Sequence, residues 1–181
     1  MSLPLTDNFS PEVLRAMERW PDVPRCCGWL ALDTRGHWLI KNQRITHART
    51  VAFLNRHYAH DDEGRWYVQN GPQQAFVDLA YTPWIFRLSG EGQFVTHTGL
   101  CCLQPQTVYS DDEGNLLLLG EMGLGLIDDR DLDPITEMFE FLSDEVVAGC
   151  RYQGRLLPLQ TLRRAGVSRT FGFDPTPRFD A

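Results

Sequence analysis

Apolar residues along the chain alternate between helical spacing and short extended runs, and the two patterns follow one another in a regular order. Ser10-Pro11-Glu12 has the residues of a helix start, and apolar side chains recur at helical spacing after it. Two apolar runs on either side of a turn at 33–36 predict a β-hairpin over residues 28–40. From Thr46 the spacing becomes helical again, for about three turns.

The rest of the chain is rich in predicted strands. Asn70-Gly71 lies between two apolar runs and predicts a second hairpin, because both residues tolerate the positive φ of a tight turn. Further extended runs cover residues 85–88, 94–96, 100–103, 116–119 and 124–127. Residues 134–142 have helical spacing, and 156–159 is typical of an edge strand because Pro158 cannot donate a ladder hydrogen bond. The tail from Asp174 is expected to lie extended on the surface or to be partly mobile.

The clearest regularity is a duplicated tetrapeptide. Asp61-Asp62-Glu63-Gly64 recurs fifty residues later as Asp111-Asp112-Glu113-Gly114, and each copy precedes an apolar run and an aspartate, Asp78 or Asp128. Before each copy stands a glycine turn with an aromatic residue two positions on. These pairs are Gly36 with Trp38 and Gly92 with Phe94. The connector between the glycine turn and the acidic turn contains a predicted helix in the first cycle and lacks it in the second.

These patterns predict an α+β, β-rich fold, with two related β units in tandem and flanking helices. Two copies are fewer than a stacked array needs, so a pair of units that share one core is favoured. The expected divisions are an N-terminal helical segment over 1–27, a first β repeat with an inserted helix over 28–88, a second β repeat over 89–128, and a helix with a C-terminal strand and tail, packed on the same body, over 129–181.

Composition narrows the classes of function. The chain is 43% apolar and 23% charged, which is typical of globular proteins, and its formal charge of −7 argues against nucleic-acid binding. No stretch approaches the about 20 apolar residues of a membrane span, and the start lacks the pattern of a secretory signal. Five cysteines without a disulfide spacing suit a reducing compartment. We expect a soluble, cytoplasmic protein with no nucleic-acid or membrane partner.

Residue spacing gives little support to metal or thiol chemistry. The acidic turns lack the alternating oxygen ligands and the distant bidentate glutamate of a calcium loop. The histidines come without a Cys-x-x-Cys or His-Glu-x-x-His element. Cys26-Cys27 and Cys101-Cys102 lie within apolar runs, where buried free thiols are expected. The sequence therefore predicts no metal, no cofactor and no catalytic residue.

Large aromatic residues alternate with uncharged hydrogen-bonding residues between positions 66 and 84. Sites for small molecules and peptides favour this mixture, because aromatic rings supply apolar area and amides fix orientation. The alternative is that Asn70-Gly71-Pro72 is only a turn and that the tryptophans belong to the core. The residues predicted to bind a ligand are Trp66, Gln69, Asn70, Gln73, Tyr81 and Trp84.

Three segments resemble a known group of proteins. They are Asp33-Thr34-Arg35-Gly36-His37-Trp38, the helix near Thr50 to Leu54, and Asp61-Asp62-Glu63-Gly64-Arg65-Trp66-Tyr67. Together they resemble small, uncharacterised bacterial proteins, the domain-of-unknown-function family numbered twelve eighty-five or a relative of it. The resemblance covers about residues 28 to 128. It implies a mixed α and β fold built from repeated motifs and a regulatory or signalling role, without catalytic residues.

The sequence leaves three functions open. The leading hypothesis is a non-enzymatic regulatory module that binds a small molecule or a protein segment near the aromatic and amide residues. The second is a hydrolase whose site is assembled from dispersed Asp, Glu and His residues. The third is a structural or oligomerising protein, such as a homodimer that pairs through an exposed strand edge at 156–159. The acidic helix at 134–142 is expected to pair with the arginine-rich C-terminal segment, or else to face a partner.

Overall fold

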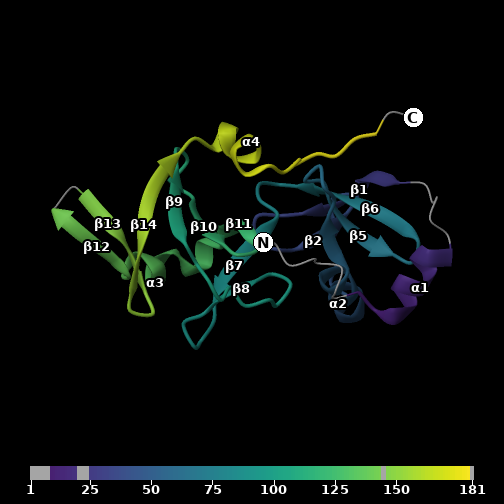
Figure 1. The fold of residues 1–181 in the computed structure, drawn as a ribbon, viewed down its shortest axis with the longest axis horizontal. Helices are drawn as coiled ribbons and strands as arrows, with labels where there is room; N and C mark the ends of the chain where they lie inside the picture. Colours follow the sequence, from purple (N-terminus) through teal and green to yellow (C-terminus); the bar gives the residue numbers. More distant parts are fainter. Residues whose placement is uncertain (1–8, 20–24, 144–145, 180–181) are drawn as a thin grey trace. The chain divides into compact units, whose positions relative to one another are not determined.

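The computed structural model describes residues 9–19, 25–143 and 146–179 (Figure 1). The chain divides into two compact units. We call Leu3–Pro83 together with Gly172–Ala181 the first unit, and Trp84–Phe171 the second unit. Each unit contains one β-sheet, so the predicted β-rich α+β fold with two tandem units is confirmed. No helix within the described ranges is long and apolar enough to span a membrane.

The first unit has a six-stranded sheet in the order β3-β2-β1-β6-β5-β4. Its strands are β1 (Cys26–Leu32), β2 (Trp38–Ile40), β3 (Gln43–Arg44), β4 (Tyr58–His60), β5 (Trp66–Asn70) and β6 (Gln73–Leu79). β1 pairs with β6 in parallel, and the other neighbours are antiparallel. Both hairpins predicted for this part of the chain, β1 with β2 and β5 with β6, are confirmed.

Two helices accompany this sheet, α1 (Pro11–Arg19) and α2 (Ala48–Arg56), and both were predicted. Val13 of α1 is buried in a cluster with Tyr67 and Phe76, which face each other across β5 and β6. Trp38 lies on the opposite face of the sheet, because side chains alternate along each strand. Its Nε1 donates to Oδ1 of Asn55 on α2 at 2.7 Å. The two helices therefore contact opposite faces.

The second unit has an eight-stranded sheet in the order β12-β13-β14-β9-β10-β11-β7-β8. Its strands are β7 (Trp84–Leu88), β8 (Phe94–Thr96), β9 (Thr107–Asp111), β10 (Leu116–Gly120), β11 (Gly123–Ile127), β12 (Phe139–Ser143), β13 (Val146–Tyr152) and β14 (Arg155–Leu162). β7 with β11 and β9 with β14 are parallel pairs. The short helices are α3 (Leu132–Thr136) and α4 (Val167–Phe171).

The two units repeat one strand order and one register. β1, β2, β4, β5 and β6 of the first unit correspond to β7, β8, β9, β10 and β11 of the second. Leu30 faces Val77 in the first parallel pair, and Phe86 faces Ile127 in the second, fifty positions after Val77. The duplicated sequence therefore corresponds to a duplicated ladder. As predicted, a helix stands in the first connector, while the described connector at 97–106 contains none.

Turns of one geometry produce this repetition. The first residue of each turn accepts, through its side-chain oxygen, a hydrogen bond from the backbone N–H four positions on; these residues are Asp33, Asp61, Ser89 and Asp111. The fourth position of each turn is a glycine with φ between 72° and 83°. Only glycine adopts such a φ without steric cost, which explains why the sequence repeats at these positions.

Three sequence-based expectations are wrong. The helix predicted over 134–142 ends at Thr136, and residues 139–143 form β12, because pairing of Phe139 with Cys150 overrides the local spacing. Residues 100–103 form no strand beyond a single bridge from Cys101 to Val95. The carboxylate of Glu121 instead accepts the N–H groups of Leu103 and Gln104.

The prediction that residues 156–159 form an edge strand is also wrong. β14 lies inside the sheet, between β13 and β9. Pro158 is tolerated there because the pairing with β9 begins only at Leu159, so no donor is required on that side of Pro158. β14 therefore has no free edge through which two copies of the chain could pair.

The C-terminal tail packs on the first unit. Pro175 accepts from the N–H of Leu79 at 2.8 Å, and the N–H of Asp174 donates to Gly64 at 3.0 Å. The tail is extended, as expected, and these hydrogen bonds hold it at Asp174 and Pro175. The predicted pairing of acidic and arginine-rich segments is found between Glu140 and Arg151.

Candidate functional site

A groove of about 500 Å³ lies in the first unit, between α2 and the strands. Its lining residues are Leu30, Ile40, Arg49, Thr50, Phe53, Leu54, Val68, Asn70 and Ala75. Small-molecule sites have volumes of roughly 300–1,000 Å³, mostly apolar walls and a few polar groups. The groove has this composition, since six of its lining residues are apolar and three are polar.

The strand register builds the floor of the groove. Leu30 faces Ile40 across β1 and β2, and Val68 faces Ala75 across β5 and β6. Leu30 is 5% exposed and Val68 is 1% exposed, so packing holds both side chains in place. Ile40 is 46% exposed and forms an accessible part of the wall. The small side chain of Ala75 leaves room above the sheet.

The polar lining residues come from the first turn of α2 and from the end of β5. Arg49 and Thr50 belong to that helical turn, and His47 caps it by accepting from the N–H of Thr50 at 3.4 Å. Asn70 is the last residue of β5, before the tight turn at Gly71. The positive end of a helix favours negative charge, and Arg49 adds a full positive charge to it.

One residue of the predicted ligand set, Asn70, lines the groove. Gln73 faces Asn70 across the hairpin. Gln69 is 1% exposed; its Nε2 donates to Gly71 at 2.8 Å, and its Oε1 has no hydrogen-bond partner within the described residues. The remaining members, Trp66, Tyr81 and Trp84, are buried aromatic residues of the two units.

The buried aromatics have packing and hydrogen-bond partners of their own. Trp66 lies 4.7 Å from Tyr58 between ring centroids, and Trp84 donates from Nε1 to the carbonyl of Met122 at 2.8 Å. Sequence reasoning missed Arg49, Thr50 and Phe53 as groove residues. The helical spacing over α2 was visible, but spacing does not show which strands a helix covers.

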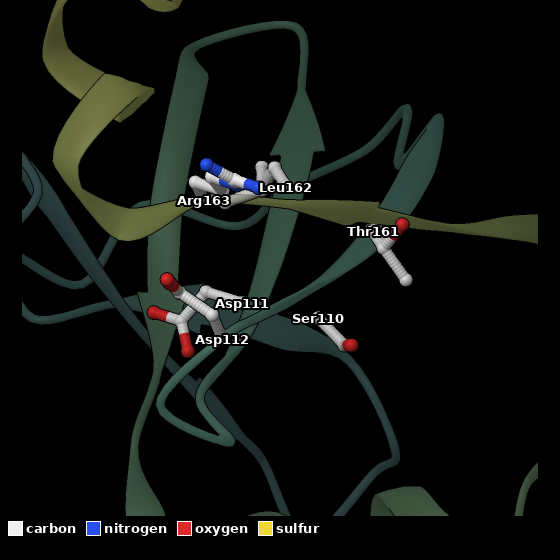
Figure 2. Close-up of a pocket in the computed structure, with 6 residues that line it drawn as sticks. All are labelled: Ser110, Asp111, Asp112, Thr161, Leu162 and Arg163. Atoms are coloured by element: carbon white, nitrogen blue, oxygen red, sulfur yellow. The ribbon is translucent and has the colours of Figure 1, made fainter.

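A second, polar cleft of about 340 Å³ lies in the second unit (Figure 2). It forms where β9 and β14 end, and its lining residues are Ser110, Asp111, Asp112, Thr161, Leu162 and Arg163. Figure 2 shows the side chain of Arg163 on one side and the carboxylates of Asp111 and Asp112 on the other. Ser110 faces Thr161 on the neighbouring strand.

The carboxylates of this cleft already have backbone partners. Asp111 accepts from the N–H groups of Glu113 and Asn115 at 2.9 and 2.8 Å, and Asp112 accepts from the N–H of Arg164 at 2.8 Å. No histidine is among the described residues that line either cleft. The cleft therefore lacks the pairing of a free carboxylate with a histidine that hydrolytic acid–base chemistry commonly uses.

The buried thiols are poor nucleophiles. Burial, together with donation to the carboxylate of Glu121 at 3.3 Å, raises the pKa of Cys102 to about 12. Burial raises the pKa of Cys150 to about 11. Both thiols stay protonated at neutral pH, whereas the thiolate is the reactive form. Within the described ranges, His, Cys, Asp and Glu form no group of three or more that could hold a metal ion.

Comparison with known proteins identifies the family. Residues 10–178 match the model of the DUF2944 family, which is described as "Protein of unknown function (DUF2946)". The chain belongs to this family. No curated protein matches the chain. The family description assigns no activity, so a function has to be argued from the geometry.

The fold also occurs in solved structures. A DUF1285 family protein from Silicibacter pomeroyi DSS-3 is similar with a TM-score of 0.57 and 16% identity, over 84% of this chain and 88% of that one. A DUF1285 family protein from Shewanella baltica OS155 matches with a TM-score of 0.45 and 12% identity, over 61% of this chain and 92% of that one. The first similarity shows a common fold, in the group that the glycine and acidic turns resemble.

Proposed function

We propose that this chain is a non-enzymatic binding module, which holds a small, mostly apolar ligand in the groove beside α2. The observation that carries the proposal is the lining of the groove, with six apolar side chains beside three polar ones. Removing apolar surface from water stabilises a complex by roughly 25 cal/mol per Å². All five cysteines are free thiols, which supports a role in a reducing compartment such as the cytoplasm.

The rigidity of the floor favours binding. Leu30 and Val68 belong to paired strands and are almost fully buried, so little side-chain freedom is lost when a ligand arrives. The exposed side chain of Ile40 offers an apolar wall that becomes buried only when the groove is filled. A regulatory role follows if occupancy of the groove stabilises α2 against the sheet.

Catalysis has less support than binding. Asp33 and His37 form a carboxylate–imidazole pair at 2.9 Å, the kind of pair that hydrolases use. However, Asp33 also accepts from the N–H groups of Arg35 and His37, at 2.8 Å each, within one turn. This pair closes the turn, and neither residue lines the groove or the polar cleft.

The test uses a neutral apolar dye, N-phenyl-1-naphthylamine, titrated into the full-length protein while its fluorescence is followed. Ala75→Leu fills the floor of the groove, and we expect it to weaken dye binding about tenfold or more. Ala52→Leu makes the same change on the exposed side of α2 and should leave binding unaltered. Circular dichroism checks that both variants fold.

A second variant keeps the test decisive if Ala75→Leu disturbs folding. Ile40→Ser removes apolar surface from a side chain that is 46% exposed, so the fold is at little risk. We expect weaker dye binding with unchanged thermal unfolding. Wild-type affinity in both Ile40→Ser and a folded Ala75→Leu would contradict the proposed function.

A further inference from the structure

We infer that the ligand of the groove is an amphipathic monoanion, with a carboxylate or similar head at Arg49 and an apolar body over Leu30, Val68 and Ala75. This inference rests on the proposed function and adds the chemical class of the ligand. Three observations support it: the charge of the lining, the position of Arg49 on α2, and the way in which the second unit fills the corresponding place.

The groove is positively charged in a protein of net charge −7. Arg49 is the one charged residue in its lining, which contains no carboxylate. Six other arginines each form an ion pair with a carboxylate; they are Arg65, Arg87, Arg130, Arg151, Arg164 and Arg178. Arg49 forms no ion pair within the part of the chain that the structure describes. A carboxylate from a ligand would supply the bidentate partner that a guanidinium favours.

The position of Arg49 strengthens the preference for an anion. It lies in the first turn of α2, a helix of nine residues whose first turn contains no acidic side chain. The helix dipole and the guanidinium therefore favour the same sign of charge. Asn70 lines the same groove and offers its amide as a neutral donor to the head group, while the hydroxyl of Thr50 is held by Nδ1 of His47 at 3.1 Å.

The second unit fills the corresponding place with its own side chains. Position by position in the repeated ladder, Leu30 and Ala75 correspond to Phe86 and Gly125. A Cβ on Gly125 would lie 2.5 Å from the ring of Phe86, so this ring occupies the space that Ala75 leaves open in the first unit. An internal aromatic group thus takes the place of an apolar ligand body.

The polar end of that place is filled as well. Asn70 corresponds to Gly120, where a Cβ would lie 2.4 Å from Sγ of Cys102. The second unit therefore fills this place with the ring of Phe86 and the thiol of Cys102, whereas the first unit leaves it to a ligand.

The test compares octanoate with 1-octanol, which differ in the charged head. Each is used to displace N-phenyl-1-naphthylamine from the full-length protein at low ionic strength. We expect octanoate to bind about tenfold more tightly than 1-octanol, as one charge-assisted contact provides. Added salt should reduce this preference.

Arg49→Gln should lower octanoate affinity about tenfold and leave 1-octanol affinity unchanged. Arg44→Gln removes the same charge from β3, from a residue that pairs with Leu39 and does not line the groove, and should change neither affinity. Equal binding of the two probes, or loss of both in Arg49→Gln, would overturn the inference. If neither probe displaced a bound dye, the inference would fail; if the dye itself did not bind, the proposed function would fail first.

Discussion

The two units share a ladder and differ in what covers it. In the first unit, the aromatic residue after the glycine turn, Trp38, packs edge-on against Tyr58 and donates to Asn55 of α2. In the second unit the corresponding aromatic, Phe94, stacks on Tyr152 of β13 at 4.9 Å between ring centroids. A helix contacts this position in one repeat and a later strand does so in the other. The turns set the ladder, and the segments between them decide which surface remains open.

The difference in covering has a consequence for binding. The helical connector leaves the floor at Ala75 open, whereas the ring of Phe86 closes the floor at Gly125. The same register therefore supports a groove in the first unit and a filled core at the corresponding place in the second. Three pairs of substitutions at corresponding positions test whether the two units are stabilised in the same way.

The largest effect is expected at the aromatic residues. Trp38→Ala and Phe94→Ala each remove a ring that is at most 1% exposed, and each should lower the free energy of unfolding by about 3–5 kcal/mol. Urea unfolding of the full-length variants measures both values. Trp29→Ala is the control: Trp29 is 54% exposed and lies under Lys41, so its loss should cost about 1 kcal/mol or less. A loss of much less than 3 kcal/mol in either variant would show that the aromatic residue at this position does not stabilise the two units equally.

The next effect distinguishes the glycines of the two acidic turns. Gly114 has a φ of 83° and open space around it, so Gly114→Ala should cost about 1–2 kcal/mol of backbone strain. Gly64 has a φ of 72°, and a Cβ there would lie 2.1 Å from the carbonyl oxygen of Gly172. Gly64→Ala should therefore cost about 1–3 kcal/mol more, because the tail must move.

Urea unfolding gives the two costs, and amide hydrogen exchange identifies the cause. Exchange at Asp174, whose N–H donates to Gly64, should accelerate in Gly64→Ala and stay unchanged in Gly114→Ala. Equal costs with unchanged exchange would mean that the tail contact contributes nothing to the stability of the turn.

The third comparison concerns the aspartates that follow each repeat. Asp128 is fully buried; burial alone would raise its pKa, but hydrogen bonds from Arg130 hold the pKa of its carboxyl at about 2. The folded pKa lies below the unfolded value of about 3.9, so this stabilisation is present above pH 4 and is lost as the pH falls towards 2. Asp128→Asn should remove on the order of 2 kcal/mol at pH 7 and little at pH 2.

Asp78 corresponds to Asp128 in the sequence but pairs with Arg178 at the surface, where the two side chains are 28% and 55% exposed. Asp78→Asn should therefore change the stability by less than about 1 kcal/mol. Urea unfolding from pH 2 to 7 compares each variant with the wild type. A pH-independent difference for Asp128→Asn would contradict its assigned role.

Local patterns predicted the elements that local chemistry controls. Asn70-Gly71, the glycine turns and the helix start at Ser10-Pro11 were recognisable because a few adjacent residues determine their backbone angles. The strand at 139–143 was missed because its apolar spacing also fits a helix, and its pairing partner lies beyond the next turn. For the candidate site, the sequence indicated Asn70, while the aromatic residues named with it lie in the core.

The two β cycles follow from local sequence alone. The duplicated acidic turns place glycines where φ must be positive, and this requirement sets the hairpins of β4 with β5 and of β9 with β10. Long-range packing decides which segment covers each ladder, and it brings Arg49 and Asn70 to one groove while it places Sγ of Cys102 against Gly120 in the other unit. These contacts join residues far apart in the chain, and the spacing of apolar residues along one segment does not specify its partner.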